Sequence, residues 1–454
     1  MNWLRLDDFD VSNPRLIRGE HDEVVEVQVD CVPNKFDVDL CCLARKLVKN
    51  GNKVVRYRDL KIEAAPTWLL VTKQRYRCQS CDRTLYQRVP HVDDKHMMTT
   101  RLREAVELSA VKRTFADTVH VHGIEPTLAT RVFRSYADRM LLNYRYKAPR
   151  VFGIDENMLL KGLRGVIVDV ENAKLLDILP GNTQSEVRRG LQTRMEDWDN
   201  VEVWCQDMAG GYKGVAEDLF PKATIVVDKF HVVTKANHWF MKIRQSETSK
   251  LPLEIRKKMP GMIRLLDMHY EKISDRQRDR IEEVMSHSRR LSDAYAIKES
   301  FYYWYDAPTR ADAEAAYTQW VQFVRSKDQM DEWKPLMTLI QRQKKYIFTY
   351  FDHRWTSGVV ERMNRSIGDI NRAANGMDFE TLRAKALLRY STLVPEWRLK
   401  MHMMEVGTGW LDGLLDADAA DDDVDDDRAY VGSGFDPSTL IADLKAGSFD
   451  APST

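Results

Sequence analysis

Residues 151–181 have the sequence VFGIDENMLLKGLRGVIVDVENAKLLDILPG, in which three runs of β-branched and aliphatic residues alternate with polar turns. Such runs predict three consecutive strands. The pattern then changes: we expect an amphipathic helix over 185–195, a strand over 201–207, a short helix over 214–220 and a fifth strand over 223–228. The order βββαβαβ predicts an α/β domain with a five-stranded sheet.

Two acidic residues lie at strand ends of this predicted domain. Asp155 closes the first strand and Asp207 closes the fourth. First and fourth strands in a sheet of this order are commonly neighbours, so we expect the two carboxylates to share a metal ion. Hard oxygen ligands suit magnesium or manganese, and two such ions favour in-line displacement at phosphorus. A single strand-end acid is more often merely solvated, and spacing alone does not choose a third carboxylate among 69 acidic residues.

A small β-rich unit is expected upstream, over residues 20–90, where EVVEVQVD, KVVRYRDL and TWLLVTKQRYRC favour strands. Three short helices follow it. Thr99 or Thr100 is expected to cap the first helix and Thr114 the second. Gly123 should break the chain after the second helix, and Pro126 should lie in the first turn of the third. Three short helices with a glycine turn before the last predict a helix-turn-helix.

An all-α insertion is expected downstream, because the sequence from His231 to about Tyr346 favours helix and has no strand signal. Its tryptophans are expected to be core residues more than base-stacking ones: Trp239, Trp304, Trp320 and Trp333. Two further helices are predicted over 359–374 and 379–394. The tail from Glu405 onward contains thirteen acidic and two basic residues, and its low-complexity composition predicts disorder.

The charges are distributed unevenly, although the formal net charge is zero. Between Arg45 and Arg88 there are twelve Lys or Arg residues and three acidic ones. A basic body with an acidic tail is compatible with DNA binding. The sequence has no apolar run of membrane-spanning length and begins with no signal-like segment, so a cytoplasmic protein is expected, associated with the nucleoid when it binds DNA.

Five motifs connect these elements to a known family: VFGIDEN (151–157), WCQDMAGGYKGVAEDLFP (204–221), VVDKFHVV (226–233), WTSGVVERMNRSI (355–367) and NRAANGMDFETLRAKALLR (371–389). They resemble the catalytic core of DDE transposases, specifically the bacterial insertion-sequence family ISL3 (ISL-three). The resemblance covers about residues 25–400. It implies a ribonuclease-H-like fold and a magnesium- or manganese-binding triad of Asp155, Asp207 and Glu361, separated by 52 and 154 residues.

The activity that this resemblance implies is DNA transposition. Such an enzyme binds terminal inverted repeats, cleaves DNA at the element ends and joins them to target DNA as a dimer or larger assembly. The alternatives are a DNA-binding regulator that has lost catalysis, and a ribonuclease-H-like nuclease or resolvase. The intact triad argues against the regulator.

The resemblance also divides the chain and adds residues around the triad. The expected parts are a zinc ribbon (1–92), a helix-turn-helix (93–147), a catalytic domain (148–231 and 347–400), a helical insertion (232–346) and the acidic tail (405–454). His231, in the Asp228-x-x-His231 element, is expected to support catalysis, with a satisfied core histidine about equally compatible. Asn364, Arg365 and Arg372 are candidates for phosphate contact, against solvated helix residues.

The DNA-reading candidates lie in the first two of these parts. A phosphate-contacting hairpin is expected at Arg75 and Arg77, although a solvated strand has a similar pattern. The third helix of the helix-turn-helix should meet base edges in the major groove near its amino end. Its candidate residues are Thr127, Thr130, Arg131 and Arg134.

A structural zinc ion is expected in the ribbon, since the Cys78-x-x-Cys81 pair is typical of half of a four-ligand site. The first half departs from the family pattern, because Asp39 stands where the family has its first cysteine. Cys42 is the expected third ligand, and the fourth is Cys41, Cys31 or Asp39. Adjacent cysteines seldom both bind one ion with relaxed geometry, which favours Cys31 or Asp39 slightly; a metal-free ribbon is the remaining alternative.

Overall fold

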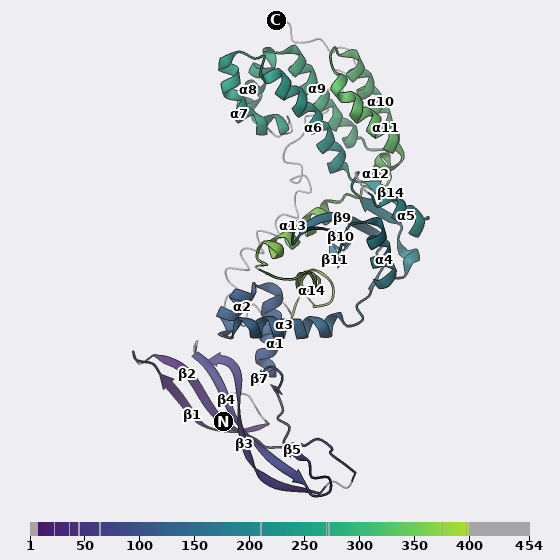
Figure 1. The fold of residues 1–454 in the computed structure, drawn as a ribbon. Coiled ribbons are helices and arrows are strands. Elements are labelled where there is room, and N and C mark those ends of the chain that lie inside the picture. Colours follow the sequence, from purple (N-terminus) through teal and green to yellow (C-terminus); the bar gives the residue numbers. More distant parts are fainter. Residues whose placement is uncertain are drawn as a thin grey trace. The chain divides into compact units, whose positions relative to one another are not determined.

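The computed structural model describes residues 8–398 except for residues 22, 36, 44–45, 63–64, 209–210, 269, 271–272, 375 and 396. The acidic tail, predicted to be disordered, lies outside the described residues. The chain forms two compact units (Figure 1). One contains the residues up to Tyr144 together with those from Arg372 onward, and the other contains Arg145–Asn371.

The first unit contains a seven-stranded sheet with the order β1-β2-β4-β3-β7-β6, and β5 pairs with β4. Its strands are β1 (Phe9–Arg18), β2 (Val24–Pro33), β3 (Leu47–Ile62), β4 (Ala65–Cys78), β5 (Thr84–Tyr86), β6 (Val92–Asp93) and β7 (Met98–Thr99). The strands predicted within residues 20–90 are confirmed as β2, β3 and β4. Alternate residues of β2 and β4, including Val29 and Leu69, are buried and form the core of this sheet.

The three predicted helices follow the sheet as α1 (Thr100–Lys112), α2 (Phe115–His122) and α3 (Pro126–Leu141). Thr99 and Thr114 cap α1 and α2 as expected, and Gly123 adopts the left-handed conformation with φ 61°. Sheet and helices are joined through Asp59 of β3, whose buried carboxylate accepts hydrogen bonds from the Thr99 hydroxyl (2.6 Å) and Arg101 Nε (2.8 Å). The ribbon and the helix-turn-helix therefore share a polar interface.

Helix α14 (Phe379–Tyr390) packs against α1 and α3, with Leu388 in the same core cluster as Phe133. Lys385 is buried, and its ammonium donates to the carbonyl oxygen of Ala110 (2.6 Å) near the carboxyl end of α1. This position differs from the sequence-based expectation, which included residues 347–400 in the catalytic domain. The hydrophobic face of α14 is covered by α1 and α3 instead.

The second unit is built on a five-stranded sheet with the order β11-β10-β9-β13-β14. Its strands are β9 (Val151–Leu159), β10 (Gly162–Asp169), β11 (Lys174–Ile178), β13 (Val203–Gln206) and β14 (Thr224–Val227), with a separate pair β8 (Tyr146–Lys147) and β12 (Met195–Glu196). Strands β9 to β11 are antiparallel, whereas β9, β13 and β14 are parallel. The predicted order and the pairing of the first and fourth strands are confirmed.

One expectation about β9 was wrong: Asp155 does not close the strand. The antiparallel ladder with β10 continues to the Leu159–Gly162 pair, so that β9 extends four residues beyond Asp155. The parallel ladder with β13 stops at the Ile154–Gln206 pair. Asp155 therefore lies at the end of the parallel pairing but within the antiparallel hairpin.

Helices cover both faces of this sheet. On one face, Phe152 of β9 stacks on Trp204 of β13 (centroids 4.4 Å apart), and Phe220, at the end of α5 (Lys213–Leu219), lies 6.0 Å from Phe152. On the other face, α13 (Gly358–Arg372) approaches β9 at Gly153, where an added Cβ would be 2.7 Å from Val360. A glycine at this position allows α13 to contact the strand closely.

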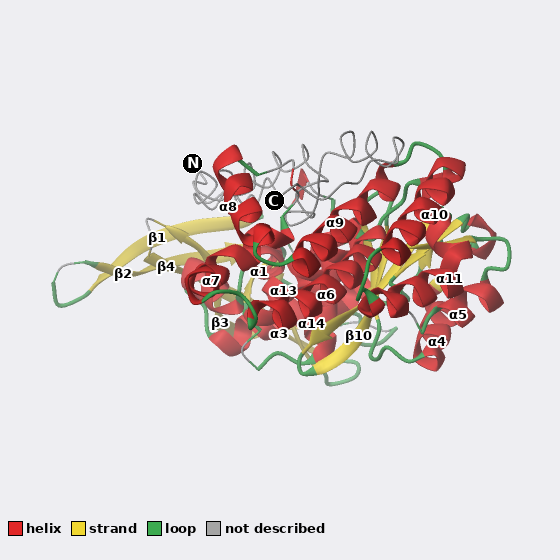
Figure 2. Ribbon diagram, turned by 90° about the horizontal axis from the view of Figure 1, so that it is seen from above, coloured by secondary structure: helices red, strands yellow, loops and turns green. Residues whose placement is uncertain are grey.

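The insertion is entirely helical in its described residues. It contains α6 (Lys229–Thr248), α7 (Leu253–Asp267), α8 (Asp275–Ser286), α9 (Arg289–Tyr303), α10 (Arg310–Ser326), α11 (Lys334–Phe348) and α12 (Tyr350–His353). Helices α6, α9, α10 and α11 pack against one another (Figure 2). Trp304, Trp320 and Trp333 are fully buried, which confirms them as core residues, while Trp239 is only half-buried. The amphipathic α4 (Gln184–Arg194) precedes the insertion, as predicted.

Candidate active site and cysteine cluster

Three aspartates occupy equivalent positions in the second unit: Asp155 lies within β9, and Asp207 and Asp228 directly follow β13 and β14. The register pairs Gly153 of β9 with Cys205 of β13, and Cys205 with Val226 of β14. Two residues further along these chain segments come Asp155, Asp207 and Asp228. Side chains two residues apart point to the same face, and neighbouring strands are about 4.8 Å apart. The three aspartates therefore form a row, which we call the carboxylate row, on the face that α13 covers.

Helix α13 is attached to both ends of the carboxylate row. Before its first turn, the Ser357 hydroxyl donates to Asp228 Oδ2 (2.5 Å); further along, Asn364 Nδ2 donates to Asp155 Oδ2 (2.9 Å). Glu361 lies between these contacts and is half-buried. Positions 357, 361 and 364 have the i, i+4, i+7 spacing of one helix face. This spacing puts Glu361 on the same helix face as Ser357 and Asn364.

The surroundings of Asp155 disfavour its charged form when no cation is bound. Burial raises its pKa to about 6, and the negative charges of Asp207 and Glu156 act in the same direction. The Glu156 backbone N–H and His231 oppose the shift without cancelling it. A carboxylate that is crowded and poorly hydrated in this way fits a site for a hard cation.

His231 lies one turn into α6 and adjoins the carboxylate row. Its Nδ1 is 3.2 Å from Asp207 Oδ1, and its Nε2 is 3.9 Å from Asp228 Oδ2. Asp228 is buried and has one carboxylate oxygen, Oδ1, without a hydrogen-bond partner among the described residues. The sequence-based alternative of a satisfied core histidine does not describe this position, because His231 is partly exposed beside two carboxylates.

Sequence reasoning missed two side chains near this site. Ser357 was treated only as part of a helix start, although its spacing of four residues before Glu361 would have placed it on the same face. Tyr212 is buried, and its hydroxyl donates to Glu156 Oε1 (3.0 Å). This bond fixes the end of the loop that begins at Asp207. No spacing pattern in the sequence identifies it.

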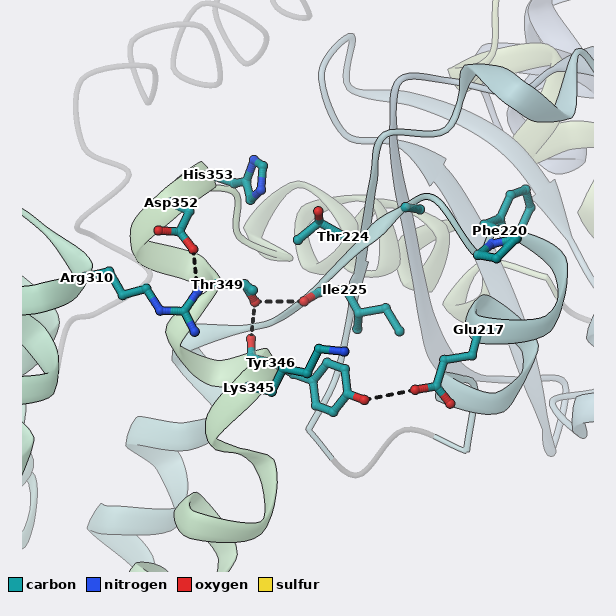
Figure 3. A pocket seen from close by; sticks show the side chains of 12 residues that line it. Glu217, Phe220, Thr224, Ile225, Arg310, Lys345, Tyr346, Thr349, Asp352 and His353 are labelled. Atoms are coloured by element: carbon teal, nitrogen blue, oxygen red, sulfur yellow. Dashed lines mark hydrogen bonds and ion pairs between the residues drawn. The ribbon is translucent and has the colours of Figure 1, made fainter.

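A pocket of about 520 Å³ lies away from the carboxylate row, beside the start of β14 (Figure 3). The Thr349 hydroxyl donates to the Ile225 carbonyl oxygen (2.7 Å), and the Tyr346 hydroxyl donates to Glu217 (2.9 Å). The residues that line the pocket include two carboxylates, Glu217 and Asp352. Glu217 accepts the hydrogen bond from Tyr346, and Asp352 pairs with Arg310 (2.7 Å), so neighbouring groups already bind both. We therefore do not assign the catalytic chemistry to this pocket.

The remaining candidates for phosphate contact lie on α13. Asn364, predicted to reach a phosphate, uses its amide nitrogen to bind Asp155 and accepts a hydrogen bond from Asn157 (2.9 Å) at its backbone oxygen. Arg365 and Arg372 are exposed on the same helix. The structure thus attaches Asn364 to the carboxylate row and leaves the two arginines at the surface.

The DNA-reading candidates of the first unit differ in exposure. Thr127 and Arg131 are exposed near the amino end of α3, whereas the half-buried Thr130 donates its hydroxyl to the Pro126 carbonyl oxygen (3.3 Å). Arg134 is exposed but forms an ion pair with Asp378, the N-cap of α14. Thr127 and Arg131 are therefore the two of these four candidates that are exposed and have no side-chain partner among the described residues.

The two strand arginines are both held by neighbouring groups. Arg75 Nε donates to the Asn50 carbonyl oxygen (2.6 Å), and Arg77 pairs with Asp82 (2.6 Å). Arg77 is exposed and Arg75 is half-buried. Their backbone positions, opposite Tyr86 and Thr84 of β5, are those of a hairpin, as expected.

Four cysteines of the first unit converge to form what we call the cysteine cluster: Cys41, Cys42, Cys78 and Cys81. Their sulfur atoms all lie within 4.8 Å of one another, with Cys42 and Cys78 3.7 Å apart. Tetrahedral zinc with bonds of about 2.3 Å requires sulfur atoms about 3.8 Å apart. Backbone N–H groups lower the pKa of Cys78 to about 6 in spite of its burial, which favours the thiolate. The cluster fits a structural zinc ion.

The structure corrects the preference for Cys31 or Asp39 as the fourth ligand. Cys31 is fully buried in the core of the β2 strand region, where burial raises its pKa to about 12. Asp39 forms an ion pair with Arg88. Both adjacent cysteines, Cys41 and Cys42, reach the cluster, because the chain before β3 is irregular there and not a strand with alternating side chains.

Comparisons with known proteins agree with this architecture. A family model described as a transposase, of the ISL3 DDE type, matches residues 152–386, just over half of the chain. A second model, the zinc-finger of transposase IS204/IS1001/IS1096/IS1165, matches residues 39–81. The chain is 25% identical over 359 residues to a transposase for insertion sequence element IS1001 from Bordetella parapertussis, covering 75% of this chain and 85% of that protein.

No helix among the described residues has the length and hydropathy needed to cross a membrane. The family match includes all three aspartates of the carboxylate row and Glu361, and the zinc-finger match includes the whole cysteine cluster. The chain therefore belongs to the ISL3 family of DDE transposases, insertion-sequence enzymes that cleave DNA and transfer the cut strands.

Proposed function

We propose that Asp155, Asp207 and Glu361 hold the divalent metal ions with which this transposase cleaves and joins DNA. The observation that supports the proposal is the attachment of α13 at both ends of the carboxylate row, through Ser357 and Asn364, because Glu361 shares the helix face of these two residues. Magnesium or manganese bound there supplies activation of the attacking water or 3′-hydroxyl and neutralisation of charge at phosphorus. The strand order supports a ribonuclease-H-like fold for this unit.

His231 is assigned a positioning role in the same site. With Nδ1 3.2 Å from Asp207, the imidazole limits the orientations of that carboxylate. Asp228 in turn holds Ser357, and through it the start of α13. Asp155, Asp207 and Glu361 would therefore contact the metal, while His231, Asp228 and Ser357 maintain their arrangement.

The first unit is proposed to recognise the terminal inverted repeats. Thr127 and Arg131 on α3 are exposed where a recognition helix meets base edges. Arg365 and Arg372 of α13 are proposed to contact phosphates nearer the cut. Transfer of two ends to one target requires two active sites, and we therefore propose a dimer or larger assembly on DNA.

The test is cleavage and strand transfer by the purified full chain on DNA that carries the inverted repeats flanking its gene. Without added divalent cation, or with Asp155→Asn, Asp207→Asn or Glu361→Gln, we expect cleavage to fall at least about a thousand-fold while end binding remains within a few-fold. Glu217→Gln, in the pocket of Figure 3, is the matched control and should retain activity.

Three results would contradict the proposal. Full cleavage by any one of the three variants would remove that residue from the triad. Cleavage without any joined product in a plasmid target would favour a nuclease or resolvase, and tight binding without cleavage under any metal condition would favour a regulator.

A further inference from the structure

One face of α6 leads away from the carboxylate row and carries basic and aromatic side chains. The helix begins directly after Asp228, and His231 in its first turn contacts Asp207. Continuing from His231 with the spacing i+4, i+7 and i+11 are Lys235, His238 and Lys242, all exposed. This spacing keeps the four side chains on one helix face. Lys235, His238 and Lys242, together with Trp239, form what we call the α6 stripe.

The opposite face of α6 explains why the stripe points outward. Val232, Ala236, Phe240 and Ile243 are buried, and α6 packs there against α9. The helix is therefore amphipathic, and its polar face is not needed for packing. From His231 at the carboxylate row to Lys242 at the far end of the α6 stripe, the helix extends about 16 Å at 1.5 Å per residue.

The positive charges of the α6 stripe are not neutralised within the described residues. Neither Lys235 nor Lys242 forms an ion pair there, whereas the exposed Lys258 of α7 pairs with Glu283 (2.5 Å). Unneutralised cations in a line match the charge pattern of a phosphate backbone. At about 3.4 Å per nucleotide, the path from His231 to Lys242 would cover about five nucleotides.

Trp239 adds a surface for a base. Its indole ring is half-buried, and Lys242 Nζ lies over one face of the ring, 4.0 Å from the centroid, so a base would stack on the other face. The other three tryptophans of the insertion are buried in its core. An aromatic ring among cations that follow a line is the combination with which proteins bind single-stranded nucleic acid.

We propose that the α6 stripe binds an unpaired DNA strand as it leaves the active site, with Lys235, His238 and Lys242 at phosphates and Trp239 stacked on a base. The proposal rests on the assignment of the carboxylate row as the catalytic centre, because the stripe begins at that centre. Its occupant is single-stranded, since a base must be unstacked from its neighbours before a tryptophan side chain can stack on it.

The experiment measures binding of the full chain by fluorescence anisotropy, with calcium present to prevent cleavage. One probe is a duplex of the inverted repeat that extends past the cleavage position as five unpaired thymidines; the other ends flush at that position. Lys235→Gln/Lys242→Gln should weaken binding to the first probe about ten-fold and reduce its salt slope by about 1.4, the value for two lost contacts to a single strand. Binding to the flush probe should change less than two-fold.

Two further variants separate charge from stacking. Trp239→Ala should weaken binding to the overhang probe about ten-fold with no change in the salt slope, because a stacked ring releases no counterions. Arg256→Gln/Lys257→Gln, which removes two exposed charges from α7 in the same insertion, is the matched control and should bind both probes like the unmodified protein.

Two outcomes would overturn the proposal. The stripe variant could behave like the α7 control on both probes, or it could lose affinity for both probes equally, which would make the surface a general duplex contact. Neither outcome affects the triad, because Asp155→Asn tests the triad through cleavage. If Asp155→Asn loses cleavage while the stripe variant binds both probes like the unmodified protein, the catalytic assignment remains and only this inference is removed.

Discussion

The cysteine cluster, which fits a zinc ion, and the carboxylate row, which we propose binds magnesium, are of opposite construction. The cluster takes four sulfur atoms from one part of the first unit and brings all of them within 4.8 Å, so the protein supplies a complete tetrahedral shell. The row takes its carboxylates from strands and from a helix 206 residues away along the chain, between Asp155 and Glu361. A complete shell suits a structural ion, whereas an incomplete one leaves positions for the oxygen atoms of a substrate.

This difference determines what each site depends on. The cluster needs only its local loops, and its loss should damage the ribbon and the DNA binding that the ribbon supports. The carboxylate row depends on the packing of α13 against β9, and its loss should damage catalysis while DNA binding continues. Substitutions in the two sites should therefore have separable effects.

Apart from the triad variants, the largest effect is expected from the cluster. Cys42→Ala or Cys78→Ala should reduce bound zinc from about one ion per chain to nearly none and weaken end binding by about 100-fold, because structural zinc sites contribute much of the folding free energy of small domains. Zinc content by elemental mass spectrometry and end binding by anisotropy provide the measurements. Cys31→Ala is the control: it should retain zinc, although truncating a buried side chain costs about 1 kcal/mol.

The adjacent pair makes this prediction sharper. Cys41→Ala should also lose zinc, since Cys41 belongs to the cluster. Retention of zinc by Cys41→Ala, together with its loss in Cys31→Ala, would show that the fourth ligand is Cys31.

A smaller effect is expected from Ser357→Ala. It removes the hydroxyl that donates to Asp228 and leaves that buried carboxylate with one partner fewer. We expect cleavage to fall about ten-fold and the magnesium concentration for half-maximal activity to rise, as for other residues that orient metal ligands. Both are measured by titrating magnesium in the cleavage assay, with end binding unchanged.

Two controls distinguish positioning from general instability. Ser357→Thr keeps a hydroxyl and should recover most of the activity, while Ser246→Ala removes an exposed serine of α6 and should have no effect. An unchanged magnesium requirement in Ser357→Ala would show that this hydroxyl does not position the metal ligands.

Much of this architecture could be predicted from the sequence, for identifiable reasons. Strand periodicity gave the order of the second unit, and Thr99, Thr114, Gly123 and Pro126 gave the helix boundaries, because caps and turns are local properties. The family motifs, and not spacing, selected Glu361 among the many acidic residues.

Other features depend on contacts that the local sequence does not encode. The length of β9 beyond Asp155 depends on the hairpin with β10. The set of four cysteines depends on the path of an irregular loop, and the position of α14 beside α1 depends on which hydrophobic surface covers it. The register that aligns the three aspartates could not be predicted from the sequence either, because it depends on how the strands pair.

The smallest effect concerns the stability of the carboxylate row without a cation. A carboxyl whose pKa is raised to about 6 in the folded protein binds its proton more tightly there than in the unfolded chain, where its pKa is near 3.8. Its contribution to the free energy of unfolding therefore falls as the pH rises from about 4 to about 6, and the penalty is complete above that range. Asp155→Asn should remove this penalty, because the amide is neutral and its oxygen still accepts from Asn364.

At pH 7.5 without magnesium, Asp155→Asn should raise the free energy of unfolding of this unit by about 2 kcal/mol, which corresponds to a Tm increase of about 5 °C. At pH 4 the two proteins should have nearly the same Tm, since Asp155 is then largely protonated. Magnesium should raise the Tm of the unmodified protein and leave the variant almost unchanged, because a bound cation compensates the buried charge of Asp155. If the Tm of the two proteins changes with pH in parallel in differential scanning calorimetry, Asp155 is not the source of the instability. The carboxylate row and the cysteine cluster would then differ only in the geometry of their ligands.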